Sequence, residues 1–79
     1  MMEEFLMFFD SKINAGYYMH LEIGYNKTAD YCIRVWRQGT DPNGKDQEMV
    51  RAEDCDINLA FAKAYIQIKT WLREHEGGY

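Results

Sequence analysis

The chain has 79 residues and a formal net charge of −4, which excludes several classes of protein. A chain this short accommodates one core, so we expect a single α+β domain over residues 1–79. Hydrophobic residues make up 47% and aromatic residues 15% of the sequence, enough for a core without a metal or a disulfide. The nine lysines and arginines form no basic cluster. Neither nucleic acid nor a membrane surface is therefore an expected partner.

The cysteine content and the N-terminal segment indicate a cytoplasmic protein. Cys32 and Cys55 form no CxxC pair and are too few for a typical small secreted domain. We expect two reduced thiols, with a Cys32–Cys55 disulfide as the alternative if the two residues come close. The N-terminal segment is apolar but carries Glu3, Glu4 and Asp10 and no early basic residue, unlike a signal peptide. No apolar run approaches the roughly 20 residues of a membrane span.

The first half of the chain predicts one short helix and two strands. Met2–Phe9 is dense in apolar residues, which predicts a helix that either packs tightly under the domain or contacts a partner. Ser11–Gly16 has the composition of a loop. Tyr17–Tyr25 alternates between apolar and other residues with period two, as in a half-buried strand, and Tyr31–Gln38 follows as the second strand.

The second half predicts a third strand and a long helix. Asp41–Gly44 contains the only proline and favours a type I turn, and the return strand covers Asp46–Ala52. Asp54–His75 has a helical apolar stripe with Asp54 as the N-cap. The predicted fold is a three-stranded antiparallel β-meander with a long C-terminal helix on one face and a short N-terminal helix, in the order α-β-β-β-α.

Hairpin geometry predicts which residues are neighbours in the sheet. A three-residue turn over residues 26–28 places Ile23 opposite Tyr31, and a three-residue loop over residues 42–44 places Trp36 opposite Val50. The face away from the long helix then carries two rows, Tyr18–Trp36–Val50 and His20–Arg34–Ala52. Aromatic residues and arginine dominate interface energetics. The N-terminal helix, a second copy of the chain or a foreign protein could cover this face.

The sequence contains no grouping that predicts catalysis. His20 and His75 are the only histidines, and Cys32 is diagonal to His20 in the predicted register, so no cysteine–histidine dyad is expected. Asp41–Asp46 lacks the spacing of an EF-hand loop. There is no phosphate-binding glycine motif. We expect no enzyme, no cofactor and no metal site, and we interpret the acidic residues near the last helix as a solvated edge and a helix cap.

The α-β-β-β-α order resembles the double-stranded-RNA-binding domain in outline, over most of the chain but as topology alone. The resemblance would imply a basic cluster at the start of the last helix that reads phosphates. The corresponding stretch here is Asp54-Cys55-Asp56-Ile57-Asn58, which would repel phosphate. The sequence therefore departs from that family at the residues that carry its function.

The composition favours a protein-interaction module. A small, acidic, aromatic-rich chain without catalytic groups has the profile of a stoichiometric inhibitor, such as those that phages and mobile elements encode against host enzymes that handle nucleic acids or act in defence. The alternatives are a sheet-face reader of single-stranded nucleic acid and a structural homodimer. The predicted partner-binding residues are Tyr18, His20, Arg34, Trp36 and Val50 on the sheet face, and Glu48, Glu53, Asp54 and Asp56 at the acidic edge.

Overall fold

The order of helices and strands agrees with the prediction. The computed structural model describes residues 1–14, 19–28, 30–37, 39 and 47–78. Helix α1 is followed directly by a π-helical segment, η1, and the three strands precede the long helix α3. The bounds are α1 Met2–Phe8, η1 Phe9–Asn14, β1 His20–Asn26, β2 Asp30–Arg37, β3 Gln47–Asp54 and α3 Ile57–His75. The strands form one antiparallel sheet in the order β1-β2-β3, which confirms the predicted fold class.

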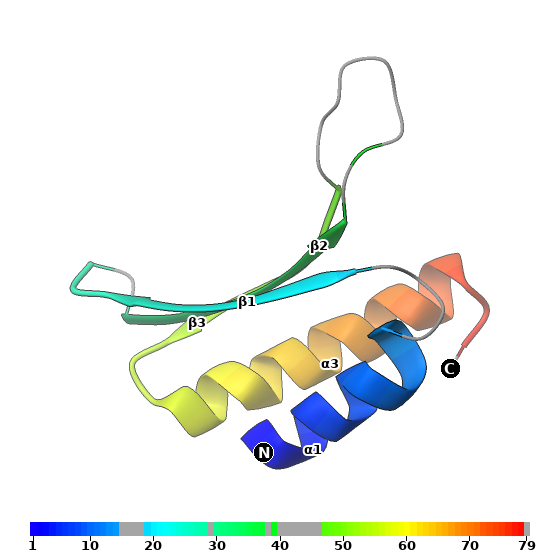
Figure 1. The fold of residues 1–79 in the computed structure, drawn as a ribbon. Coiled ribbons are helices and arrows are strands. Elements are labelled where there is room, and N and C mark those ends of the chain that lie inside the picture. Colours follow the sequence, from blue (N-terminus) through cyan, green and yellow to red (C-terminus); the bar gives the residue numbers. More distant parts are fainter. Residues whose placement is uncertain (15–18, 29, 38, 40–46, 79) are drawn as a thin grey trace.

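Both helices lie on the same face of the sheet (Figure 1). Helix α3 packs against β3 and β2, and α1 packs against α3. Phe5 of α1 is fully buried, with its ring centroid 5.5 Å from that of Phe61 and 6.3 Å from that of Tyr65. The alternative in which the N-terminal helix folds over the second face is therefore wrong, because its apolar residues join the core under the first face. No described element covers the second face.

The N-terminal helical segment is longer than predicted. Ser11–Gly16 was expected to be a loop, but helical structure continues to Asn14. Phe9 and Ile13 in this continuation are buried in the same core as Phe5. Burial of these two side chains explains why the backbone remains helical beyond α1, since packing of an apolar side supplies most helical stability.

The first hairpin is shifted by two residues from the predicted register. Ile23 pairs with Ile33 and Tyr25 with Tyr31. The Asn26 side-chain oxygen accepts a hydrogen bond from the backbone N–H of Thr28 at 2.9 Å. Because side chains alternate with period two, a shift of two residues keeps every residue on its predicted face.

The second hairpin is shifted by one residue at Val35, and this changes the surface. Val35 pairs with Val50 and Arg34 with Arg51, and an irregularity then brings Trp36 opposite Glu48. Val50 is only 1% exposed and belongs to the core, as does Ala52. The prediction that these two residues lie on the open face was wrong, because an odd shift moves a strand's side chains to the other face.

Two predicted features lie outside the described residues: Tyr18 and the turn Asp41–Gly44. The helix cap is described and differs from the prediction. Asp56, not Asp54, caps α3, and its carboxylate accepts hydrogen bonds from the backbone N–H groups of Asn58 and Leu59 at 2.8 and 3.4 Å. The helix starts later than predicted because β3 extends to Asp54.

Candidate functional site

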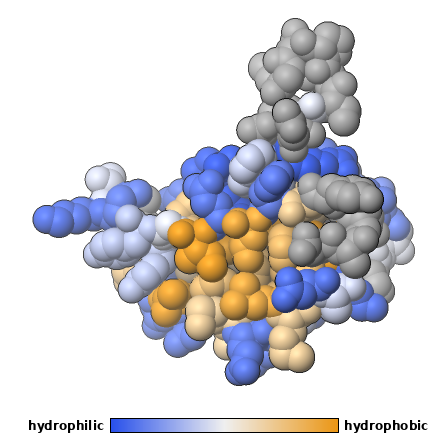
Figure 2. Space-filling view, viewed as in Figure 1, coloured by the Kyte–Doolittle hydropathy of each residue, from blue (hydrophilic) through white to orange (hydrophobic). Residues whose placement is uncertain are grey.

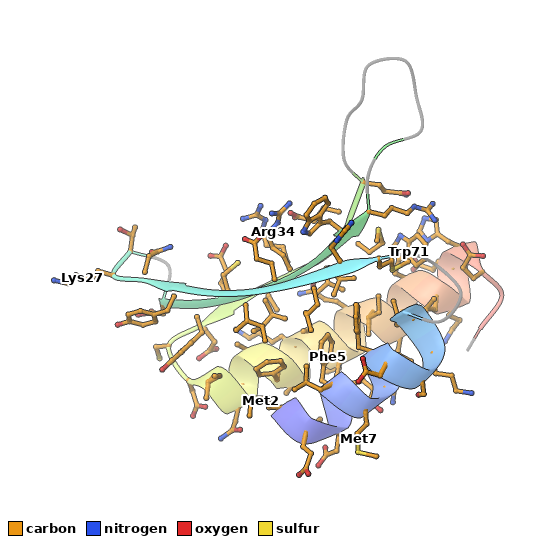
Figure 3. All side chains as sticks on the ribbon, in the orientation of Figure 1. Met2, Phe5, Met7, Lys27, Arg34 and Trp71 are labelled. Atoms are coloured by element: carbon orange, nitrogen blue, oxygen red, sulfur yellow. The ribbon has the colours of Figure 1, made fainter. Side chains whose placement is uncertain are left out.

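The open face of the sheet carries a network of charged side chains centred on Glu48. Arg34 donates from Nε to Glu48 Oε2 at 2.7 Å, and Arg51 donates from Nε to Glu48 Oε1 at 2.8 Å. Arg34 also lies 3.5 Å from Glu22, and Arg51 lies 3.7 Å from Glu53. Figure 3 shows Arg34 on the side of the sheet opposite the helices. Both arginines of this face are thus already neutralised by carboxylates of the same chain.

The aromatic part of this face is smaller than predicted. The structure brings His20 and Trp36 together, with ring centroids 4.5 Å apart and nearly parallel planes. The guanidinium of Arg34 lies 5.6 Å from the centre of the Trp36 ring. Trp36 is half-buried, and its Nε1 has no hydrogen-bond partner among the described residues. Three of the predicted residues therefore form one cluster, from which Val50 is absent.

The charge network gives a prediction for the pH dependence of stability. Hydrogen bonds from Arg51, and then from Arg34, hold the pKa of the Glu48 carboxyl below its ordinary value, although partial burial opposes them. A carboxyl with a lowered pKa in the folded state contributes stability that is present above its ordinary pKa of about 4.3 and is lost as the pH falls through the lower folded value. We expect Glu48→Gln to lose less stability than the wild type on acidification.

The measurement is the free energy of unfolding in urea, from neutral pH to below about pH 4. Glu76→Gln is the matched control, because it removes one carboxylate from the exposed end of α3, outside the network. An identical change of the pH profile in both variants would contradict a role for the Glu48 network.

The other predicted acidic residues also have internal contacts. Asp54 accepts a hydrogen bond from Lys63 Nζ at 2.8 Å and another from the backbone N–H of Asp56 at 2.9 Å. These bonds, with that from Lys63 first, hold the pKa of Asp54 below its ordinary value. Asp56 caps α3, and Glu53 lies beside Arg51. The acidic edge therefore has structural roles within the domain, and binding of a partner there remains a prediction.

The two cysteines differ in exposure. The structure has both cysteines free, with Cys32 half-buried on the open face and Cys55 exposed. Burial, followed by the nearby Glu53 carboxylate, raises the pKa of the Cys32 thiol, which disfavours the nucleophilic thiolate. Within the described residues, no three His, Cys, Asp or Glu side chains are grouped as metal ligands. In the same part of the chain, no helix has the length and apolar character needed to cross a membrane.

A second candidate surface, missed by the sequence analysis, lies on the helix side of β1. Leu21, Ile23 and Tyr25 share the face of the buried Ile33 and Val35, because they pair across the first hairpin. Ile23 is nevertheless 47% exposed and Tyr25 63% exposed. The reason is that α3 packs under β3 and β2, so the outer strand extends past the helix that buries its neighbours.

This apolar area continues onto the N-terminal helix. Met1 is 45% exposed and Met2 44% exposed. Figure 2 shows hydrophobic residues gathered between the sheet and the helices on the side of the molecule that carries β1 and α1. We call Leu21, Ile23, Tyr25, Met1 and Met2 the β1 surface. Exposed apolar residues that gather on one side of a small protein mark candidate interaction sites.

A third candidate is a shallow depression of about 260 Å³ between α3 and β3. Met49, Ile66 and Trp71 supply its apolar lining, while Gln67, Thr70 and Glu74 are polar. Ile66 is 67% exposed and lies on the same side of α3 as Leu59 and Ala62. The depression lacks a charged or polar side chain buried deeply enough to hold a specific ligand. Ile66 therefore provides a control position for mutations of the β1 surface.

Comparison with known proteins gives no family for this chain. No protein-family model matches it, and neither the curated proteins nor the solved structures provide a significant match. The function must therefore be inferred from the surfaces described above.

Proposed function

We propose that this protein is a non-catalytic protein-interaction module of the cytoplasm and that its contact surface is the β1 surface. The observation that carries the proposal is the exposure of Ile23 and Tyr25 on the strand at the edge of the sheet. Removing such side chains from water would contribute roughly 25 cal/mol for each Å² of apolar area buried. The two free thiols fit a reducing compartment.

The open face supports nucleic-acid binding less well. Binding to phosphates requires cationic groups that can release counterions. Arg34 and Arg51 instead share Glu48, and each has a further glutamate within 4 Å. A strand of nucleic acid would have to break these pairs before it could use either arginine.

The same reasoning bears on how an inhibitor would act. An inhibitor that imitates nucleic acid needs carboxylates that are free to meet a basic channel. Glu48, Asp54 and Asp56 are each held by donors of this chain. Stoichiometric inhibition of a host enzyme, of the kind that phages encode, would therefore act through the apolar β1 surface and not through the acidic edge.

Tyr25→Asp tests the proposal. The side chain is 63% exposed, and its ring centroid lies 5.0 Å from that of Tyr31. The fold should therefore persist in the variant, as checked by far-UV circular dichroism. We expect at least a tenfold loss of association, whether with another copy or with a protein captured from the cells that encode the chain, because a charge would be buried in an apolar contact.

Ile66→Asp is the matched control. It places the same charge at an equally exposed apolar residue beside the depression between α3 and β3. Unchanged association in Tyr25→Asp, or loss of association in Ile66→Asp alone, would overturn the assignment of the β1 surface.

A further inference from the structure

We propose that the β1 surface binds a second copy of this chain, with the two β1 strands paired antiparallel about Ile23 so that two sheets become one. This inference rests on the proposed function and names its partner. Three observations support it: the two edges of the sheet differ, two-fold symmetry permits few registers for a pair of β1 strands, and the single formal charge of β1, on Glu22, favours one of these registers.

The two edges of the sheet differ in whether the fold protects them. Along β3, the backbone N–H of Arg51 donates to the Gln67 side chain of α3 at 3.0 Å, and Lys63 Nζ donates to the Glu53 carbonyl at 3.2 Å. An irregularity at Val35/Trp36 also interrupts this pairing. Side chains that occupy backbone groups, bulges and charges are the usual means of blocking an edge.

Strand β1 has no bulge in its pairing with β2 and carries one formal charge, on Glu22. Its sequence, His-Leu-Glu-Ile-Gly-Tyr-Asn, contains no lysine and no proline, and its pairing with β2 is regular over all seven residues. One row of its backbone N–H and C=O groups faces away from β2, because β1 is the first strand in the sheet order. The exposed apolar side chains of Ile23 and Tyr25 belong to this edge strand.

Symmetry restricts how two β1 strands can pair. A two-fold axis perpendicular to the sheet keeps each face on the same side, so opposed residues must come from the same face. Of the permitted registers, the one centred on Ile23 overlaps the whole strand. It places Ile23 opposite Ile23 of the second copy and Leu21 opposite Tyr25, which joins the two apolar rows.

The charge on the polar face favours the same register. Glu22 then lies opposite Gly24 of the second copy, where no charge is present. The neighbouring register centred on Glu22 would instead place two carboxylates directly opposite each other, which is destabilising. Gly24 has open space around it, with no atom within 4 Å of an added Cβ, so the glutamate meets no steric obstacle. The β1 strand is thus complementary to itself in charge.

The first test is the solution mass over a wide concentration range, combined with disulfide trapping. In a Cys32→Ser/Cys55→Ser background, Ile23→Cys should cross-link to itself under mild oxidation. Directly opposed residues have Cα atoms about 4.5–5.5 Å apart, within the range of about 4.4–6.8 Å that a disulfide spans. Tyr25→Cys should not cross-link alone but should do so when mixed with Leu21→Cys.

A second test uses charge at Gly24. In the dimer, Gly24→Lys would place a lysine opposite Glu22 of the other copy at two symmetry-related positions. Gly24→Glu would instead create two pairs of opposed carboxylates, which repel each other. We expect the dimer dissociation constant to fall about threefold to tenfold in the first variant and to rise by a similar factor in the second. Thr70→Lys and Thr70→Glu, on the exposed side of α3, control for the change in net charge.

The outcomes separate this inference from the proposed function. A dimer with the stated cross-links supports both. A wild-type monomer at every concentration overturns the dimer, yet the proposed function stands if Tyr25→Asp abolishes binding of a foreign protein. A dimer that survives Tyr25→Asp, or that cross-links equally well through Ile66→Cys, overturns the β1 pairing.

Discussion

Replacing Phe5 with alanine is expected to lower the free energy of unfolding by about 3–5 kcal/mol. The side chain is fully buried and contacts Phe61 and Tyr65 of α3, with Phe9 at a ring distance of 6.5 Å. A domain of this size has a total stability near the lower end of about 5–15 kcal/mol. The substitution should therefore remove most of the stability, as measured by urea unfolding monitored through circular dichroism.

Met7 of the same helix provides the control. Its side chain is 68% exposed and points away from the sheet, whereas Phe5 points toward it (Figure 3). Met7→Ala should change the free energy of unfolding by no more than about 0.5 kcal/mol. A loss below about 1 kcal/mol for Phe5→Ala would show that α1 does not dock on α3 in solution.

Val50→Asp is expected to prevent folding. Val50 is buried opposite Val35, so a carboxylate at this position would lose its water without gaining a partner. Such burial costs several kcal/mol, which is comparable to the whole stability of the domain. Far-UV circular dichroism and urea titration should show an unfolded or nearly unfolded chain.

The adjacent residue tests the register of the second hairpin. Arg51 lies on the open face, and its ion pairs are exposed to solvent, so Arg51→Ala should leave the domain folded with only a small loss of stability. If Val50→Asp folded normally, the register predicted from the turn, with Val50 on the open face, would be correct and the described pairing wrong.

The candidate site was only partly predictable from the sequence. His20, Arg34 and Trp36 were placed on one face correctly, because alternation within a strand is a local property. Val50 was misplaced because the irregularity between β2 and β3 leaves no clear local signal. The β1 surface was missed because Ile23 and Tyr25 have the pattern of core residues, and their exposure depends on where α3 crosses the sheet.

The sequence by itself determined the α+β class, the order of the elements and the apolar stripe of the long helix, since these follow from hydrophobic periodicity. The tertiary structure alone decided that α1 shares a face with α3, that Asp56 caps the helix and that β1 extends beyond the helices. Periodicity states which side of an element is apolar. It does not state which neighbour covers that side, because packing between distant segments depends on the shapes and contacts of all of them together.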